Sequence, residues 1–233
     1  MKIKKFESEL LDVKELTPTV RHFVFSVPDG FSFNAGSIMN VSIPVEDGKI
    51  KRLYSIASNP ANRGFIEFCI KYVENGPASK FLFNLKIGEK VEFLGPFGTF
   101  TIKDKSKDLI LISTGAGIAP FRSMLYEFFN EGFDKKILML NGYRFENEVL
   151  YENELIKFKK EHNNFDYKIV ISRPKTNIKN KGRVQILVDK YIKNDFEGDF
   201  YLCGLNDMIE SVRVLLIEKG FDSKRIYFER FDV

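Results

Sequence analysis

The sequence predicts a two-domain protein, with an antiparallel β-barrel followed by an α/β domain built on a parallel sheet. Two observations predict this. Short segments of alternating polar and apolar residues, divided by turn residues, fill the first hundred positions. From Leu109 onward, continuous apolar runs alternate with amphipathic segments, which is typical of strand–helix–strand units. The boundary falls near Lys103–Ser106, so we expect domains at residues 1–104 and 105–233.

The strands expected in the first domain end at turn signals. RHFVFSV (21–27) alternates with period two and stops at a Pro-Asp-Gly turn. One helix is expected over 77–85, because Pro77 suits a first turn and apolar residues follow at helical spacing. Strands spaced by roughly ten to fifteen residues indicate an antiparallel barrel or sandwich. The other expected strands are 38–44, 53–58, 65–73 and 90–95.

The second domain begins with the buried-strand pattern LILIS (109–113). The alternation of strands with crossover segments predicts a parallel sheet with right-handed connections. Further apolar strands are expected at 136–142, 166–172, 199–204 and 225–230. The segments at 119–130, 148–162, 184–192 and 207–220 stand between them.

Composition excludes several classes of protein. The 233 residues are 44% hydrophobic and 29% charged, as in a globular protein, and no apolar run reaches the roughly 18 to 20 residues that span a bilayer. The N-terminal segment alternates polar and apolar residues and lacks a signal-peptide pattern. A net charge of +4, split almost evenly between the halves, does not indicate nucleic-acid binding. We therefore expect a cytoplasmic protein without a membrane span.

Metal and disulfide chemistry are not expected either. Cys69 and Cys203 lie far apart without a CxxC motif, which excludes a cysteine-ligated iron–sulfur cluster or zinc ribbon within the chain. His22 and His162 cannot form a typical histidine metal site. The alternating pattern around His22 indicates a half-buried strand residue.

Three local patterns indicate a bound anion. RLYSIAS (52–58) puts a cation beside a tyrosine and a serine, either on a half-solvated strand or in a grip on a flat anionic ligand. In LILISTGAGIAPFRSML (109–125), a buried strand enters a glycine turn and then a helix, whose N-terminus suits a pyrophosphate. Between Lys168 and Lys193 stand eight basic residues and one acidic residue, Asp189; a solvated loop face is the alternative interpretation.

Polar or reactive residues recur where the expected strands end. Thr114, Ser172 and Cys203 all fall at such positions, and ligands of open parallel sheets bind beyond the carboxyl ends of the strands. Alone, Cys203 would be a core cysteine. Together the three residues indicate one rim that lines a ligand.

The ordered set of motifs resembles the ferredoxin–NADP reductase family over essentially the whole chain. The motifs are RLYSIAS, GPAS, GPFGTF, TGAGIAP, SR, GRVQ, YLCG and a final aromatic residue after ER. The resemblance implies a flavin-binding antiparallel barrel followed by a parallel pyridine-nucleotide domain. It also implies that FAD and NADP(H) are the cofactors, with NAD(H) as the alternative nucleotide.

For the flavin, the resemblance implies that Arg52 pairs with the pyrophosphate, Tyr54 stacks on the isoalloxazine ring and the Ser55 hydroxyl bonds near flavin N5. Arg52 and Tyr54 share one face of a strand, whereas Ser55 needs a bend or bulge to join them. Tyr72 is the implied adenine platform. The other implied flavin contacts are Leu53, Cys69, Ile70, Lys71, Gly76, Pro77, Ala78 and Ser79.

For the nucleotide, the resemblance implies a pyrophosphate turn at Thr114, Gly115, Ala116, Gly117, Ile118 and Pro120. Ser172, Arg173 and Arg183 would hold the 2′-phosphate. Cys203 and Gly204 would border the nicotinamide, with Ser55, Cys203 and Glu229 as the residues nearest the chemistry. The family pattern ends on a tyrosine that covers the flavin; here two residues follow Phe231, which we expect to shield the ring.

The function implied is hydride exchange with NADP(H) and single-electron exchange with a small acidic carrier, ferredoxin or flavodoxin. Two alternatives use the same scaffold. One is a free flavin reductase, against which GPAS argues, because that motif supplies a grip for the AMP half of FAD. The other is an electron-transfer subunit of a larger redox complex.

Overall fold

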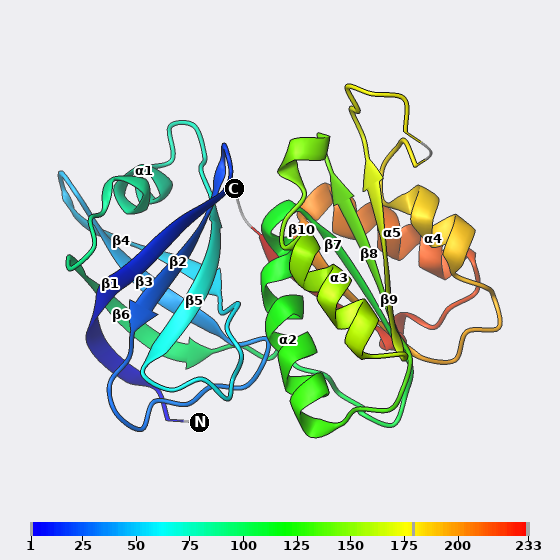
Figure 1. Ribbon diagram of the computed structural model, residues 1–233, viewed down its shortest axis with the longest axis horizontal. Helices are drawn as coiled ribbons and strands as arrows, with labels where there is room; N and C mark the ends of the chain where they lie inside the picture. The colour runs from blue at the N-terminus through cyan, green and yellow to red at the C-terminus, as the bar shows by residue number, and fades with distance from the viewer. Residues whose placement is uncertain (1, 179, 232–233) are drawn as a thin grey trace. The chain divides into compact units, whose positions relative to one another are not determined.

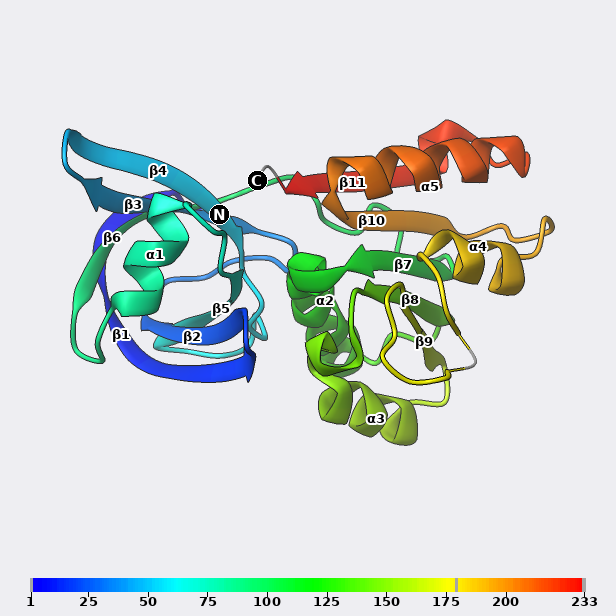
Figure 2. The same ribbon diagram turned by 90° about the horizontal axis from the view of Figure 1, so that it is seen from above.

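The computed structural model describes residues 2–178 and 180–231. By its contacts the chain divides into two compact units: residues up to Thr101 with Ala119–Glu131, and Ile102–Ile118 with the chain from Gly132 onward. Each unit contains one sheet; Figure 1 labels the strands except β11, which Figure 2 labels.

The sheet of the first unit is antiparallel, with the strand order β4-β3-β6-β1-β2-β5. A bridge between Ile56 and Phe68 joins the chain just after β4 to β5, so the two outer strands meet and the sheet closes into a barrel. This confirms the predicted antiparallel barrel. Its elements are β1 (Lys4–Thr17), β2 (Val20–Ser26), β3 (Ile38–Val45), β4 (Gly48–Ser55), β5 (Phe65–Lys71), α1 (Pro77–Asn84) and β6 (Lys90–Phe97).

Phenylalanine side chains fill the barrel core. Phe23 and Phe25 of β2 both point inward, and their rings lie 6.2 Å apart. The ring of Phe25 also meets those of Phe68 and Phe93, with centroids 6.1 and 5.1 Å away. Helix α1 adds Leu82 to the same core, and begins with Pro77 as the sequence predicts.

Two strands differ from the sequence prediction. Strand β1, the longest of the barrel, was not predicted as a strand, because seven of its fourteen residues are charged. Register shifts at Leu10/Asp12 and Glu15/Thr17 interrupt its pairing with β2. The strand predicted at 53–58 lies instead at Gly48–Ser55. As an outer strand, β4 carries exposed lysines that conceal its pattern.

The sheet of the second unit is parallel, with the order β11-β10-β7-β8-β9, as predicted. The chain runs outward through β7, β8 and β9 and returns to β10 on the other side of β7, so the direction of winding reverses between β7 and β10. Figure 2 shows α4 and α5 on one face of this sheet and α3 on the other. The strands are β7 (Leu109–Thr114), β8 (Ile137–Tyr143), β9 (Phe165–Ile171), β10 (Asp199–Leu205) and β11 (Ile226–Phe231).

The crossovers follow the prediction with one shift. The segment predicted as helical over 148–162 splits into η2 and α3, because Tyr151 has a left-handed φ of 55° immediately before α3. The helices are η1 (Gly115–Gly117), α2 (Ile118–Glu131), η2 (Glu146–Glu148), α3 (Glu152–Glu161), α4 (Gln185–Tyr191), α5 (Asn206–Glu218) and η3 (Ser223–Arg225).

Candidate active site

Strand β4 presents Arg52 and Tyr54 on one face. They pair with Val41 and Met39 of β3, whose side chains enter the barrel core. Tyr54 packs against that core, with its ring 6.3 Å from the ring of Phe68. Arg52 is exposed at the rim, where its Nη1 donates to its neighbour's carbonyl at 3.0 Å. A cation and an aromatic ring therefore stand side by side, as an extended anionic aromatic ligand requires.

The Tyr54 phenol stays neutral in the physiological range. Burial raises its pKa to about 12, although the nearby charge of Arg52 acts in the opposite direction. A neutral phenol keeps its proton and can donate a hydrogen bond.

Leu53 and Ser55 alternate to the opposite face of β4. Leu53 is 58% exposed, whereas Ser55 is buried. The register with β3 is regular through the Ile38↔Ser55 pair, so the bulge considered at Ser55 is not in the strand; the strand ends there instead. In this structure the Leu53 side chain points away from the face of Tyr54, which leaves its main chain for a ligand.

Strand β5 brings the second group of predicted flavin residues close to the first. The Ile56–Phe68 bridge lies between the end of β4 and the stretch Cys69–Tyr72. Cys69 and Ile70 are buried and Lys71 is exposed. The partly exposed ring of Tyr72 contacts Phe83 of α1 edge-on at 5.2 Å.

The N-terminus of α1 holds Ala78 and Ser79 in its first turn, as predicted. Ser79 does not point outward: its Oγ accepts a hydrogen bond from Val73 N–H at 3.0 Å and lies 3.1 Å from the carbonyl oxygens of Val73 and Gly76. The hydroxyl thus holds the turn before the helix. The main-chain N–H groups of Ala78 and Ser79, in the first turn after Pro77, are the groups suited to an anion.

The glycine turn of the second unit packs tightly against the end of β10. Gly115 has a left-handed φ of 53°. A Cβ on Gly117 would lie 2.2 Å from the Cys203 carbonyl oxygen, and a Cβ on Gly204 would lie 2.7 Å from Thr114 Oγ1. Only glycine fits both positions. The structure therefore brings Thr114–Gly117 and Cys203–Gly204 together at the point where the winding of the sheet reverses.

The same helix start holds the other predicted turn residues. Ala116 lies within η1, Ile118 begins α2 and Pro120 stands in its first turn. Proline is well placed there, because the first N–H groups of a helix have no carbonyl partner within it.

Cys203 is a buried thiol rather than a reactive surface group. Its side chain is 0% exposed, and burial raises its pKa, with the charge of Glu229 acting in the same direction. Glu229 is its direct neighbour on β11, and Phe231 pairs with Leu205 two positions further along. The predicted nicotinamide residues of β10 and β11 thus share one end of the sheet.

The stretches that carry the residues predicted for the 2′-phosphate meet at one main-chain bridge. Ile171, at the end of β9, forms a parallel bridge with Lys181, and Gly182 N–H donates to the Ile171 carbonyl at 2.9 Å. Arg173 and Arg183 each follow two residues beyond this bridge, and both are exposed. Ser172 precedes Arg173 and donates from its N–H to the Tyr143 carbonyl at 2.9 Å. Of the basic residues of this stretch, Lys179 lies outside the described residues.

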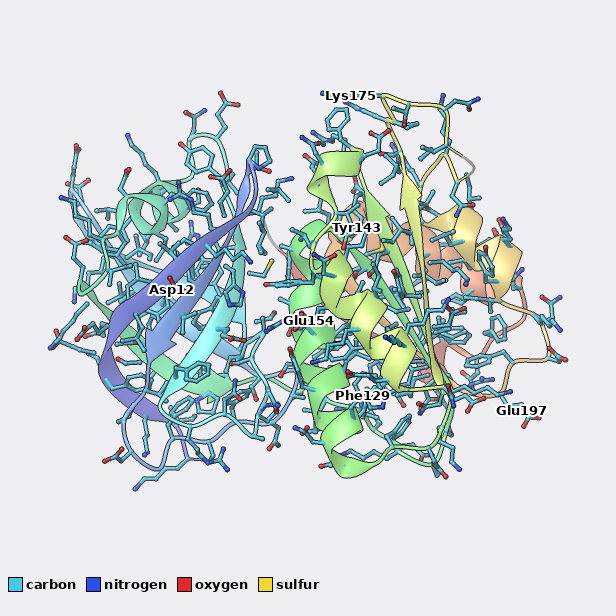
Figure 3. All side chains as sticks on the ribbon, in the orientation of Figure 1. Asp12, Phe129, Tyr143, Glu154, Lys175 and Glu197 are labelled. Carbon is cyan, nitrogen blue, oxygen red and sulfur yellow. The ribbon has the colours of Figure 1, made fainter. Side chains whose placement is uncertain are left out.

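Sequence reasoning missed the acidic anchor of this loop. The Glu146 carboxylate accepts hydrogen bonds from Lys175 N–H at 3.0 Å and from Thr176 N–H and Oγ at 3.1 and 2.8 Å. Its own N–H and those of the loop lower its pKa to about 2. Figure 3 labels Lys175 in this loop, beyond the end of β9. No local pattern pointed to Glu146, because its partners lie about thirty residues away.

A charge network on the barrel was missed as well. Arg122 of α2 donates to the Glu67 carboxylate at 2.6 Å and to the Ala57 carbonyl at 2.7 Å, while His22 Nε2 lies 3.7 Å from Glu67. Burial alone would raise the pKa of Glu67, but hydrogen bonds to His22 and Arg122 and the charge of Arg122 lower it to about 2. His22 is half-buried as predicted, yet it belongs to an ionic network.

Neither a metal-binding cluster nor a membrane-spanning helix is found among the described residues. Within 2–178 and 180–231, no group of three or more histidine, cysteine or acidic residues is arranged to hold a metal ion. No helix in that part of the chain has the length and apolar character needed to cross a membrane.

Family models match both units. The oxidoreductase FAD-binding domain matches residues 7–102, and the oxidoreductase NAD-binding domain matches residues 111–214. Among curated proteins, the chain is similar to ferredoxin–NADP reductase B of Sorangium cellulosum, with 33% identity over 97% of this chain and 98% of that protein. It is 29% identical to the toluate 1,2-dioxygenase electron transfer component of Pseudomonas putida, but spans only 59% of that protein.

Solved structures share the fold. Ferredoxin–NADP+ reductase from Plasmodium falciparum, solved with 2′P-AMP, has a TM-score of 0.83 and 26% identity, covering 97% of this chain and 96% of that one. The Amycolatopsis cytochrome P450 reductase GcoB has a TM-score of 0.89 at 21% identity, covering 98% of this chain and 70% of its own.

Proposed function

Because this chain belongs to the ferredoxin–NADP reductase family of FAD- and NAD(P)-binding oxidoreductases, we propose that it exchanges hydride with NADP(H) and single electrons with a small acidic carrier protein. Residues 1–104 form the FAD domain and residues 105–233 the nucleotide domain in this proposal. The packing of Gly117 on the Cys203 carbonyl supports it most directly, because it joins the two glycine-containing strand ends into one nucleotide site.

The described residues fit the flavin. Arg52 offers an exposed guanidinium for the pyrophosphate, and Tyr54 offers a ring on the same face. The first turn of α1 supplies main-chain N–H groups, and Tyr72 supplies an aromatic surface for the adenine. When bound, FAD supplies the chemistry that converts a two-electron hydride into single electrons.

The protein's own residues orient and enclose that chemistry. In the proposal, Thr114–Gly117 hold the nucleotide pyrophosphate, while Cys203 and Gly204 border the nicotinamide. Cys203 acts through its shape and its main chain, because its buried thiol is neutral and offers no charge to the nicotinamide. Glu229 and Phe231 lie on the adjacent strand, and Ser55 ends the strand that bears Tyr54.

NADPH is the preferred nucleotide in this proposal. The Ile171–Lys181 bridge supports this, because Arg173 and Arg183 both follow it by two residues. A hydrogen bond to a charged group contributes on the order of 1.5–3 kcal/mol, and both arginines are exposed, which puts them at the lower end. Together they contribute about 3 kcal/mol, or roughly a hundredfold in affinity.

Comparing kcat/KM for NADPH and NADH tests this preference. We expect a large preference for NADPH at low salt that shrinks as salt screens the contacts. The Arg173→Ala, Arg183→Ala double variant serves as the site variant and Lys190→Ala, in the same basic stretch, as the control. Equal use of both nucleotides by the wild type at low salt, unchanged in the double variant, would exclude these arginines from the site.

Flavin content tests the rest of the proposal. The purified protein is expected to be yellow and to release FAD on denaturation. FMN release would assign it to FMN-dependent chemistry, and weak exchangeable flavin would support a free flavin reductase. A screen of ferredoxins and flavodoxins with NADPH identifies the carrier; a chain of net charge +4 favours an acidic one.

A second candidate is an electron-transfer component of a larger system, favoured by the similarity to the toluate dioxygenase component. Gel filtration of the native protein from its own cells distinguishes the two, since a component elutes with its partners. We place either reaction in the cytoplasm, where the free thiols of Cys69 and Cys203 remain reduced.

A further inference from the structure

The segment Ile56–Ser58, which follows β4, is fully buried and bonded to Glu67 from two sides. Ala57 N–H donates to the Glu67 carbonyl at 2.8 Å, and Glu67 N–H donates to Ser58 Oγ at 3.0 Å. The segment starts directly after Ser55. Its position therefore determines where the end of β4 lies.

Arg122 holds this junction from α2. One guanidinium nitrogen contacts both the Ala57 carbonyl at 2.7 Å and the Glu67 carboxylate at 2.6 Å, so it connects the segment after β4 with β5. The guanidinium also lies 5.0 Å from the ring centroid of Tyr126, one turn further along α2. Arg122 is 11% exposed and Glu67 15%, so water competes little for these contacts.

The same helix begins at the glycine turn. Helix α2 starts at Ile118, directly after Gly117, and Arg122 follows within the next turn. Arg122 therefore lies on the helix that begins directly after this turn.

We propose that Arg122 is a positioning residue for the flavin: by fixing the Ala57 carbonyl and the Glu67 carboxylate, it holds Tyr54 and Ser55 in the geometry that hydride transfer requires. The inference rests on the proposed function. A displacement of about 1 Å caused by a change remote from the chemistry can cost on the order of a hundredfold in rate. The effect of Arg122 is transmitted through the main chain, so it should alter the rate of flavin reduction more than nucleotide affinity.

The test compares three variants of the FAD-loaded protein. Arg122→Met removes the charge and both hydrogen bonds, and Arg122→Lys keeps the charge but loses the planar guanidinium. Arg63→Met is the matched control, because Arg63 also bonds main-chain carbonyls of the same unit, at 3.0 Å, but on the exposed surface. Anaerobic stopped-flow with saturating NADPH gives the limiting reduction rate, and visible circular dichroism reports the flavin environment.

We expect Arg122→Met to change the flavin dichroism and to slow the limiting rate at least tenfold, per bound FAD, with the Kd for NADPH within threefold of wild type. Arg122→Lys should recover part of the rate, and Arg63→Met should stay within twofold. A wild-type rate and dichroism in Arg122→Met would overturn the proposal, as would a change confined to the NADPH Kd.

Two other results of these measurements are also decisive. If Arg122→Met does not fold, Arg122→Lys decides by the same measurements: a slower rate with altered dichroism supports the proposal, and wild-type values refute it. If the wild type binds FAD but neither NADPH nor NADH reduces it, the proposed function fails, and unchanged flavin dichroism in Arg122→Lys and Arg122→Met would separately refute the positioning role.

Discussion

Replacing Glu67 with glutamine should destabilise the barrel in a pH-dependent way. The Glu67 carboxylate is 15% exposed and lies between Arg122 and His22, which lower its pKa from an ordinary 4.5 to about 2. A group whose pKa is lowered in the folded state contributes stability above its unfolded pKa and loses it as pH falls through the folded pKa. The lowering of the pKa from 4.5 to about 2 corresponds to roughly 3 kcal/mol at pH 7.

The expected profile follows from the two pKa values. Linkage leaves roughly 3 kcal/mol of this stabilisation at pH 4.5, about 1.4 kcal/mol at pH 3 and less than about 0.5 kcal/mol at pH 2. Glu67→Gln carries a neutral group at every pH, so the difference in unfolding free energy between wild type and variant should shrink over this range. At low pH the protonated Glu67 of the wild type also leaves Arg122 without a carboxylate partner. The cost of losing that partner is then the same in wild type and variant and cancels in the comparison.

Urea unfolding of wild type and Glu67→Gln at pH 7, 4.5 and 3 measures the difference at low ionic strength. Glu92→Gln is the matched control: this barrel carboxylate bonds Lys5 and Ser42, both at 2.9 Å, but its side chain is 26% exposed against 15% for Glu67 and its main partner, Lys5, is exposed, so its loss should cost less. An equal cost of Glu67→Gln at pH 7 and pH 3 would refute the reasoning, because a packing defect does not titrate.

Three further predictions concern the second unit. Gly117→Ala should leave FAD bound but abolish flavin reduction by NADPH, because its Cβ would lie 2.2 Å from the Cys203 carbonyl oxygen. Gly132→Ala is the control, because its left-handed glycine has open space and the change costs only local strain of about 1 kcal/mol, so similar losses in both would contradict the packing argument. The buried Cys203 thiol should resist alkylation at pH 8 until the protein unfolds, and rapid labelling seen by mass spectrometry would show that it is accessible. Glu146→Gln should speed hydrogen exchange at the Lys175 amide and raise the KM for NADPH more than it lowers kcat, whereas unchanged exchange would show that the loop holds without this carboxylate.

Most of the fold could be predicted because its signals are local. The continuous apolar run LILIS predicts a strand buried on both faces, and Pro77 predicts the start of α1. Strand β1 was not predicted, although its alternation is visible in the sequence, because half of its residues are charged. The start of α3 at Glu152 was not predicted, because the left-handed backbone conformation of Tyr151 is not signalled in the sequence as a glycine would signal it.

The candidate site likewise contains residues that could be predicted from local sequence and residues that could not. Residues that lie within one strand or turn, such as Arg52 with Tyr54, could be grouped from their spacing. The contacts of Arg122 with Glu67 and Ala57 span 55 and 65 residues, so only the tertiary structure brings them together. His22 looked like an ordinary strand residue because its partner Glu67 lies on the neighbouring strand.

The loop after β9 shows how tertiary structure changes an argument from charge. Among the charged residues from Lys168 to Lys193, all but Asp189 are basic. The sequence alone therefore favours a general electrostatic attraction for any anion. In the folded unit Glu146 places a fixed negative charge against the main chain of Lys175 and Thr176, within this basic surface. The Glu146 carboxylate already accepts hydrogen bonds from N–H groups of the loop, so it orders the loop. Its negative charge also weakens the general attraction of this stretch for anions. In the proposed function, selectivity for a 2′-phosphate would then depend on the hydrogen bonds of Arg173 and Arg183 rather than on net charge. For that reason the arginine double variant should affect nucleotide choice far more than removal of Lys190, although Lys190→Ala lowers the positive charge as well.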